Sequence, residues 1–236
     1  MVIVSVRAYM RKYKTIAIDF HGTLAKRSAL PRNDEYFLKL CAEYQKRHYH
    51  YSIELVIKQL DRCLVGHNSE DIETFSELDS DLGELTRKYI HHTKNAILVD
   101  GLLYSDTIPA IDTLHKEGYN IVVQSNSSPY FVEQMLKMGL EGHVDGVVSS
   151  SLLHLKKPHP EFFKALARDP SVNHKPCDIV GIDNEVPNLY GMRKASWGGS
   201  ILIDREGYNP GVSSNQISTL EDLPEIIERM EKQYAA

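Results

Sequence analysis

The chain of 236 residues has few cysteines, no excess of basic residues and no long apolar run. Its cysteines, Cys41, Cys63 and Cys177, are odd in number and widely spaced, with no CxxC pair, so neither a disulfide framework nor a zinc site is indicated. The formal net charge of −5 argues against the broad basic surface of a nucleic-acid-binding protein. Any phosphate chemistry must therefore depend on a local site rather than on the charge of the whole surface.

Targeting and membrane segments are also missing from the sequence pattern. No run approaches the roughly 18 apolar residues that a membrane span needs. In residues 1–14 the basic residues follow the apolar start, which is the reverse of their order in a secretory signal. There is no internal repeat and no low-complexity linker. We expect a soluble, cytoplasmic protein in a reducing compartment, with neither a membrane nor a nucleic acid as partner; the sequence says nothing of the oligomeric state.

Five short apolar runs, rich in β-branched residues and bounded by glycine or polar residues, have the character of buried strands. They cover residues 14–19, 119–125, 144–149, 177–182 and 199–204. Helical patterns lie between the last four, at residues 129–139, 160–169 and 186–196. Strands that alternate with helices predict an α/β fold, with a Rossmann-like, doubly wound parallel sheet covered on both faces.

The pattern changes between the first two predicted strands. Residues 33–93 read as helices only, starting after Pro31 with an Asn-Asp cap and with apolar residues at helical spacing. Residues 97–118 then return the chain to the sheet through another helix. We therefore predict an α/β core domain formed by residues 1–24 and 97–236, with a helical cap domain, residues 25–96, inserted after the first strand.

Polar groups gather at the predicted carboxyl ends of the strands. Asp19 and Ser125 end two strands, Asp183 follows a third, and Lys157 lies in the loop before a helix. In an open parallel sheet the functional site lies beyond these strand ends. Two acids, a hydroxyl and a lysine suit an anionic substrate bridged by Mg²⁺, because the acids can hold the metal while the other two groups neutralise phosphate oxygens.

Four segments, in this order, resemble the motifs of the haloacid dehalogenase superfamily, most of whose members are phosphatases. They read DFHGTL (19–24), QSNSS (124–128), KKPHPEFF (156–163) and VGIDNEVPNLYGMRKA (180–195). The helical insertion directly after the first motif resembles the first class of cap domain in that superfamily. The resemblance implies a Mg²⁺-dependent phosphatase that hydrolyses a small phosphorylated metabolite. The substrate cannot be read from the sequence, because the cap would select it and the cap has no motif that identifies a substrate.

The resemblance also implies roles for individual residues. Asp19 would be the nucleophile that takes the phosphoryl group as an aspartyl phosphate. Lys157 would lie between Asp19 and the phosphate and offset their negative charges. Ser125, assisted by the Asn126 backbone, would bind a phosphoryl oxygen, and Thr23 would brace the turn beside the substrate.

The implied metal ligands are Asp19, Asp183, the backbone carbonyl of His21, and Asn188. Two of these positions depart from the usual pattern of the superfamily. Its phosphatases carry a second Asp where His21 stands, serving as general acid and base, and usually an acid where Asn188 stands. Since residue 21 would ligate through its backbone, the first change need not empty the metal site. Asn188 keeps an oxygen but lowers the negative charge, for which Glu185 could compensate.

The role of His21 is open between two alternatives. As a replacement proton donor it has a suitable reference pKa, about 6.5 against about 3.9 for Asp. Alternatively, it only fills space, and catalysis proceeds poorly. Two rival functions are a 2-haloacid dehalogenase, a branch that lacks the second Asp as well, and a non-catalytic relative that binds a phosphorylated ligand. Retention of Asp183 favours the phosphatase over the dehalogenase.

Overall fold

The computed structural model describes residues 11–26, 103–127 and 135–235, together with isolated residues at positions 42, 43, 45, 46, 84 and 132. The predicted cap domain, residues 25–96, lies almost wholly outside the described residues and stays a prediction. Among the described residues, no helix has the length and apolar character needed to cross a membrane.

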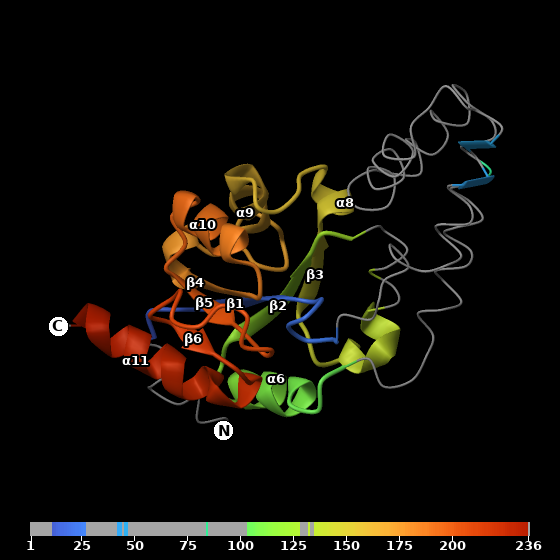
Figure 1. Ribbon diagram of the computed structural model, residues 1–236. Coiled ribbons are helices and arrows are strands. Elements are labelled where there is room, and N and C mark those ends of the chain that lie inside the picture. The colour runs from blue at the N-terminus through green and yellow to red at the C-terminus, as the bar shows by residue number, and fades with distance from the viewer. Residues whose placement is uncertain are drawn as a thin grey trace.

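A six-stranded parallel sheet forms the centre of the molecule, in the order β3-β2-β1-β4-β5-β6 (Figure 1). The pairings between all neighbouring strands are parallel. The strands are β1 (Thr15–Asp19), β2 (Asn120–Ser125), β3 (Gly146–Ser149), β4 (Ile179–Asp183), β5 (Gly199–Ile203) and β6 (Gln216–Ile217). The first five confirm the predicted strands to within about two residues at each end.

Helices cover both faces of this sheet, as predicted (Figure 1). On one face lie α6 (Thr107–Lys116), the short helix η4 (Leu220–Asp222) and α11 (Leu223–Ala235). On the other lie α8 (Ser150–Leu153), α9 (Pro160–Leu166) and α10 (Val186–Lys194). The remaining short helices are η2 (Leu136–Leu140) and η3 (Pro176–Asp178). The fold is thus an α/β, Rossmann-like fold with a doubly wound sheet.

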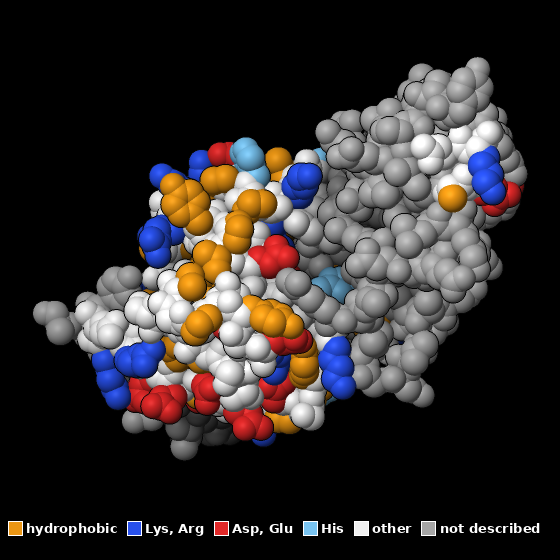
Figure 2. Space-filling view, viewed as in Figure 1, with side chains coloured by type: hydrophobic (Ala, Val, Ile, Leu, Met, Phe, Trp, Pro, Cys, Tyr) orange, Lys and Arg blue, Asp and Glu red, His pale blue; other side chains and the backbone are white. Residues whose placement is uncertain are grey.

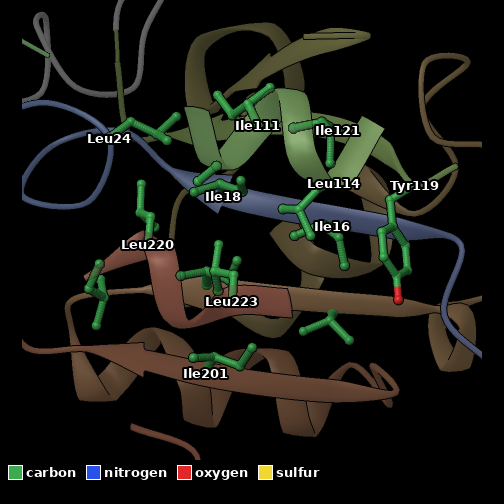
Figure 3. Close-up of a cluster of buried hydrophobic side chains, with 14 of the residues drawn as sticks. Ile16, Ile18, Leu24, Ile111, Leu114, Tyr119, Ile121, Ile201, Leu220 and Leu223 are labelled. Atoms are coloured by element: carbon green, nitrogen blue, oxygen red, sulfur yellow. The ribbon is translucent and has the colours of Figure 1, made fainter. Parts of the chain in front are cut away.

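Two hydrophobic clusters fix these layers, one on each side of the sheet. In Figure 3 the side chains of Ile16 and Ile18 from β1 lie among those of Ile111 and Leu114 from α6 and Leu223 from α11. The opposite cluster is centred on aromatic and sulfur-containing side chains: Phe162, Phe163, Met192 and Trp197. Because β1 is central and its residues are buried on both faces, the position of its last residue is held by the whole core.

Charged residues of both signs are interspersed on the surface. Over the described part of the face in Figure 2, blue lysine and arginine side chains alternate with red acidic and orange hydrophobic ones. No continuous basic patch covers that part of the face, in keeping with the net charge of −5.

Candidate active site

The strand register brings three of the predicted site residues to one edge of the sheet. Ile18 of β1 pairs with Val123 of β2 on one side and with Ile182 of β4 on the other. The next residue of β1 is Asp19, and the next of β4 is Asp183. Ser125 ends β2, one residue beyond the partner of Asp19. The carboxyl ends of the central strands therefore carry these polar groups side by side.

Lys157 joins the two acids. Its ammonium Nζ donates to Asp19 Oδ1 at 2.5 Å and to Asp183 Oδ2 at 2.8 Å. All three side chains are nearly or fully inaccessible to solvent, with exposed fractions of 2% for Lys157, 9% for Asp19 and 0% for Asp183. Among the described residues, the two acids thus share the one cation of Lys157, so the buried site is one positive charge short whenever both acids are ionised.

The loop that carries Lys157 is held against the end of β2. The side-chain amide of Asn126 donates to the Lys157 carbonyl oxygen at 3.0 Å, and the Lys157 backbone N–H donates to Asn126 Oδ1 at 2.9 Å. On the other side, α10 packs closely at Gly191, where a Cβ would collide with the Pro158 carbonyl oxygen. Lys157 therefore approaches the acids from a backbone that is fixed on two sides.

The segment after Asp19 forms a tight turn, which we call the Asp19 loop (residues 20–25). The Leu24 and Ala25 amides both donate to the Phe20 carbonyl oxygen, at 3.0 and 2.9 Å. Gly22 has φ +81°, a conformation that favours glycine. The turn brings the Thr23 hydroxyl to Asp19 Oδ2, to which it donates at 3.2 Å. This hydrogen bond is compatible with the bracing role expected of Thr23, and its role beside a substrate stays a prediction.

The electrostatics of the site follow from burial and from the unequal charges. Burial raises the pKa of Asp19 and Asp183 adds to the rise, while Lys157 and Thr23 oppose it, so that the pKa stands at about 7. Burial alone would lower the pKa of Lys157, but Asp183 and Asp19 outweigh it and raise that pKa above its ordinary value. Lys157 therefore stays charged at neutral pH.

Asp183 is oriented by its own neighbours. Its Oδ1 accepts hydrogen bonds from Asn188 Nδ2 and from the Glu185 backbone N–H, both at 2.9 Å. Asn188, predicted as a metal ligand, thus donates its amide to the acid beside it. Among the described residues, no group of three His, Cys, Asp or Glu side chains gathers in a way that could hold a metal ion. A metal here would therefore also need backbone, amide or water oxygens.

Ser125 and His21 complete the set of predicted residues. The Ser125 hydroxyl is buried and, within the described part of the chain, has no hydrogen-bond partner. His21 is half-buried, and its ring meets Phe20 edge-on with the ring centroids 5.0 Å apart. A buried hydroxyl without a partner among the described residues is a candidate contact for a ligand.

Three contributions were missed by the sequence reasoning. The Asn126 side chain holds the Lys157 backbone, whereas only the Asn126 backbone was expected to act. Arg205, which follows β5, donates to the Thr23 carbonyl oxygen and forms an ion pair with Asp106. No motif marks Arg205 or Asp106, which are 99 positions apart in the sequence.

Comparison with protein families places this site in a known context. The family model described as haloacid dehalogenase-like hydrolase matches residues 13–195. That range contains all the predicted site residues. A comparison with curated proteins found none that matches the chain.

Solved structures that resemble this fold include phosphatases and dehalogenases. A HAD phosphatase from Thermococcus onnurineus is 20% identical, with a TM-score of 0.61 over 91% of this chain and 97% of that one. A 2-haloacid dehalogenase from Pseudomonas syringae pv. Tomato is 15% identical, with a TM-score of 0.61 over 92% and 99%. A β-phosphoglucomutase from Clostridium difficile is 14% identical, with a TM-score of 0.67 over 94% and 99%. At these identities the likeness is one of fold.

Proposed function

The chain belongs to the haloacid dehalogenase-like hydrolase family, and we propose that within this family it is a Mg²⁺-dependent phosphatase of a small phosphorylated metabolite. The observation that carries the proposal is the buried pair of acids, Asp19 and Asp183, bridged by the single cation of Lys157. Within the part of the chain that the structure describes, this site has fewer positive than negative charges when both acids are ionised, and the Ser125 hydroxyl at the end of the neighbouring strand has no hydrogen-bond partner. A divalent cation and a phosphate group would together satisfy both features.

Asp19 is the proposed nucleophile. One of its carboxylate oxygens forms a bond to phosphorus while the bond between phosphorus and the leaving oxygen breaks, and the leaving oxygen takes a proton. Water then attacks the phosphorus of the aspartyl phosphate, which releases inorganic phosphate and restores the carboxylate. Lys157 Nζ, at 2.5 Å from Asp19 Oδ1, and the hydroxyl of Ser125 offset negative charge during both steps.

The donor set fits Mg²⁺, which proteins usually bind through one or two carboxylates, with water and substrate phosphate completing the shell. Asp19, Asp183, the His21 carbonyl oxygen and Asn188 would hold it. Bound there, the ion would draw charge from the phosphoryl oxygens and align them with Asp19. The hydrogen bond from Asn188 to Asp183 supports at least a positioning role, because it fixes the carboxylate that would face the ion.

His21 is the proposed proton donor to the leaving oxygen and acceptor from the attacking water. An imidazole can serve both steps near neutral pH, and such catalysis contributes roughly 10² to 10⁴ in rate. We expect an acid-leaning rate optimum in the wild type and a loss of at least about 10²-fold in kcat in His21→Ala. A flat pH profile from about pH 5 to 9, together with an unimpaired His21→Ala variant, would leave the histidine as a space-filling residue.

The central test is hydrolysis of p-nitrophenyl phosphate by the wild type and by Asp19→Asn, each with Mg²⁺ and with EDTA. Turnover that needs Mg²⁺ and falls by about 10³-fold or more in Asp19→Asn is expected. Asp112→Asn is the matched control, because that carboxylate pairs with His143 at 2.7 Å and takes no part in the site. Phosphate release that is equal in Asp19→Asn and wild type would overturn the proposal.

A 2-haloacid dehalogenase is the second candidate. The observation in its favour is that the residue two positions after Asp19 is His21 rather than a second acid. Against it stands Asp183, whose fully buried carboxylate adds the negative charge that a metal site needs and a metal-free dehalogenase does not. Chloride release from 2-chloropropionate in EDTA, without any phosphatase turnover, would favour this candidate.

A further inference from the structure

Arg205 forms a two-pronged ion pair with Asp106 outside the predicted motifs. Its Nη1 donates to Asp106 Oδ2 at 2.9 Å and its Nη2 to Asp106 Oδ1 at 3.0 Å. The exposed fractions of the two side chains are 10% and 8%. This bidentate pairing fixes the orientation of the guanidinium plane, whereas the ammonium group of a lysine could not be oriented in this way.

Asp106 also accepts hydrogen bonds from outside the ion pair. Its Oδ2 accepts from the Thr219 hydroxyl at 2.7 Å and from the Leu220 backbone N–H at 2.9 Å. Burial raises the pKa of Asp106, but the hydrogen bonds from Arg205, Thr219 and Leu220 outweigh it and hold the pKa below its ordinary value. Asp106 is thus a charged anchor for Arg205 that accepts four hydrogen bonds.

From this anchor Arg205 reaches the Asp19 loop. Its Nε and Nη2 both donate to the Thr23 carbonyl oxygen, at 3.1 and 2.8 Å. Its guanidinium carbon lies 3.8 Å from the ring centroid of Tyr104, so the ring covers one face of the cation. Thr23 in turn donates its hydroxyl to Asp19 Oδ2. A continuous series of contacts therefore runs from Asp106 through Arg205 and Thr23 to Asp19.

The same place joins the two segments that flank the predicted cap. The Leu24 carbonyl oxygen accepts from the Tyr104 backbone N–H at 3.0 Å and from the Thr107 hydroxyl at 2.6 Å. Ala25 and Leu103 form an antiparallel bridge. The outgoing and returning chain are thus tied to each other directly beside the carbonyl group that Arg205 holds.

We propose that Arg205, anchored by Asp106, is a positioning residue that holds the Asp19 loop in the conformation that orients the Asp19 carboxylate. Its kinetic consequence rests on the proposed phosphatase function, whereas its hold on the loop does not. Arg205 touches neither acid of the site, so it acts through Thr23. A misplacement of a reacting group by about 1 Å can cost about 10²-fold in rate, so a loosened Thr23 would lower kcat more than it would alter KM.

The test compares Arg205→Ala and Arg205→Lys with a control, Arg11→Ala. Arg11 also pairs with a carboxylate, Glu117, at 3.2 Å and also covers an aromatic ring, Tyr119, at 4.3 Å, but it precedes β1 and so lies at the other edge of the sheet. Two measurements are made on the full chain. One is the hydrogen exchange of amides in residues 20–25, and the other is kcat and KM for p-nitrophenyl phosphate with Mg²⁺.

In Arg205→Ala we expect exchange of the Leu24 and Ala25 amides to quicken by about tenfold or more. We expect kcat to fall by about 10- to 100-fold, with KM changed little and kcat partly restored by added guanidinium. Arg205→Lys keeps the positive charge but loses the planar guanidinium that makes two hydrogen bonds at once. The increase in amide exchange and the fall in kcat should therefore both be smaller than in Arg205→Ala. Arg11→Ala should leave both measurements as in the wild type.

Unchanged exchange in residues 20–25 would overturn the proposal whatever the activity, as would faster exchange without any fall in kcat. If the wild type shows no phosphatase turnover, the proposed function fails, and the exchange measurement alone still decides whether Arg205 holds the loop. If Arg205→Ala does not fold, Arg205→Lys and Asp106→Asn take its place, with the same expected direction and the same outcomes against it.

Discussion

Asp19 and Asp106 are both buried acids facing a cationic side chain, yet their pKa values move in opposite directions. That of Asp19 rises to about 7, chiefly through burial and with a contribution from Asp183. Burial also raises that of Asp106, but Arg205 and the other donors more than reverse the effect. The difference lies first in burial, since Asp19 lies deeper than Asp106, and then in charge and donor number. Among the described residues, two acids share one lysine at Asp19, whereas Asp106 has an arginine to itself and four hydrogen bonds.

This contrast distinguishes a site that a bound ligand would stabilise, at Asp19, from a site whose charges are already paired within the protein, at Asp106. A carboxylate that is paired with its own arginine and accepts four hydrogen bonds, as Asp106 does, stabilises the fold and has little left to offer a substrate. A buried carboxylate with too little positive charge around it is held at a cost in free energy, which a bound cation would remove. Each prediction below tests whether the two acids differ in this way.

The largest effect is expected from Lys157→Met in EDTA. Removal of the shared cation leaves Asp19 and Asp183 buried without compensation, so the free energy of unfolding should fall by about 3–5 kcal/mol in urea denaturation. Lys164→Met is the control, because Lys164 pairs with Glu161 at 2.7 Å on an exposed helix surface and its loss should be barely measurable. A Lys157→Met protein as stable as this control would contradict the description of the site.

A smaller loss is expected from Asp106→Asn, which removes the ion pair but keeps one oxygen for hydrogen bonds. The free energy of unfolding should fall by about 2 kcal/mol at pH 7. Because the folded-state pKa of Asp106 is lowered, its stabilisation is present above the unfolded pKa of about 3.9 and is lost as pH falls through the folded value. Urea denaturation of wild type and variant should therefore differ most near neutral pH and converge in acid.

A gap between wild type and Asp106→Asn that is constant with pH would mean that the charge of Asp106 is not what stabilises this region. Asp112→Asn serves as the control here as well, because the Asp112 side chain is 41% exposed and its contact with His143 joins only surface groups.

Local patterns predicted the strands and the polar groups at their ends. Each strand is a short apolar run bounded by turn residues, and the parallel register then brings Asp19 and Asp183 together without further information. Strand β6 (Gln216–Ile217) was missed because two residues are too few to show the alternation of apolar and polar residues that marks a strand. Its pairing with β5 depends on the folded sheet rather than on the local sequence. Helix α11 did have a signal, since Leu223, Ile226, Ile227 and Met230 recur at helical spacing and are buried.

Contacts between distant segments could not be predicted in this way. Arg205 follows a strand and Asp106 precedes a helix, and neither position has a residue type or spacing that marks a partner. Their meeting depends on the placement of β5, α6 and η4 around the core. Asn126 shows the same limit at shorter range, because only the folded loop reveals that its side chain binds the Lys157 backbone.

The smallest effect, with the opposite sign, is expected from Asp19→Asn in EDTA. The folded-state pKa of Asp19 is raised to about 7, so the contribution of its carboxyl group to stability is fully present below the unfolded pKa of about 3.9 and is lost as pH rises through the folded value. At pH 8 the wild type must bury a charge that the amide does not carry. Asp19→Asn should therefore be more stable than the wild type there, by about 1 kcal/mol, because the weaker bond to Lys157 offsets part of the gain.

The measurement is urea denaturation of both proteins in EDTA at pH 5 and pH 8. At pH 5 the folded wild type already holds a proton on Asp19, so the stabilisation by Asn should be smaller than at pH 8. A variant that is less stable than the wild type at pH 8 would show that Lys157 fully compensates Asp19. In that case Asp19 and Asp106 would be the same kind of acid, and the shortage of positive charge that supports a cation-dependent site would be absent.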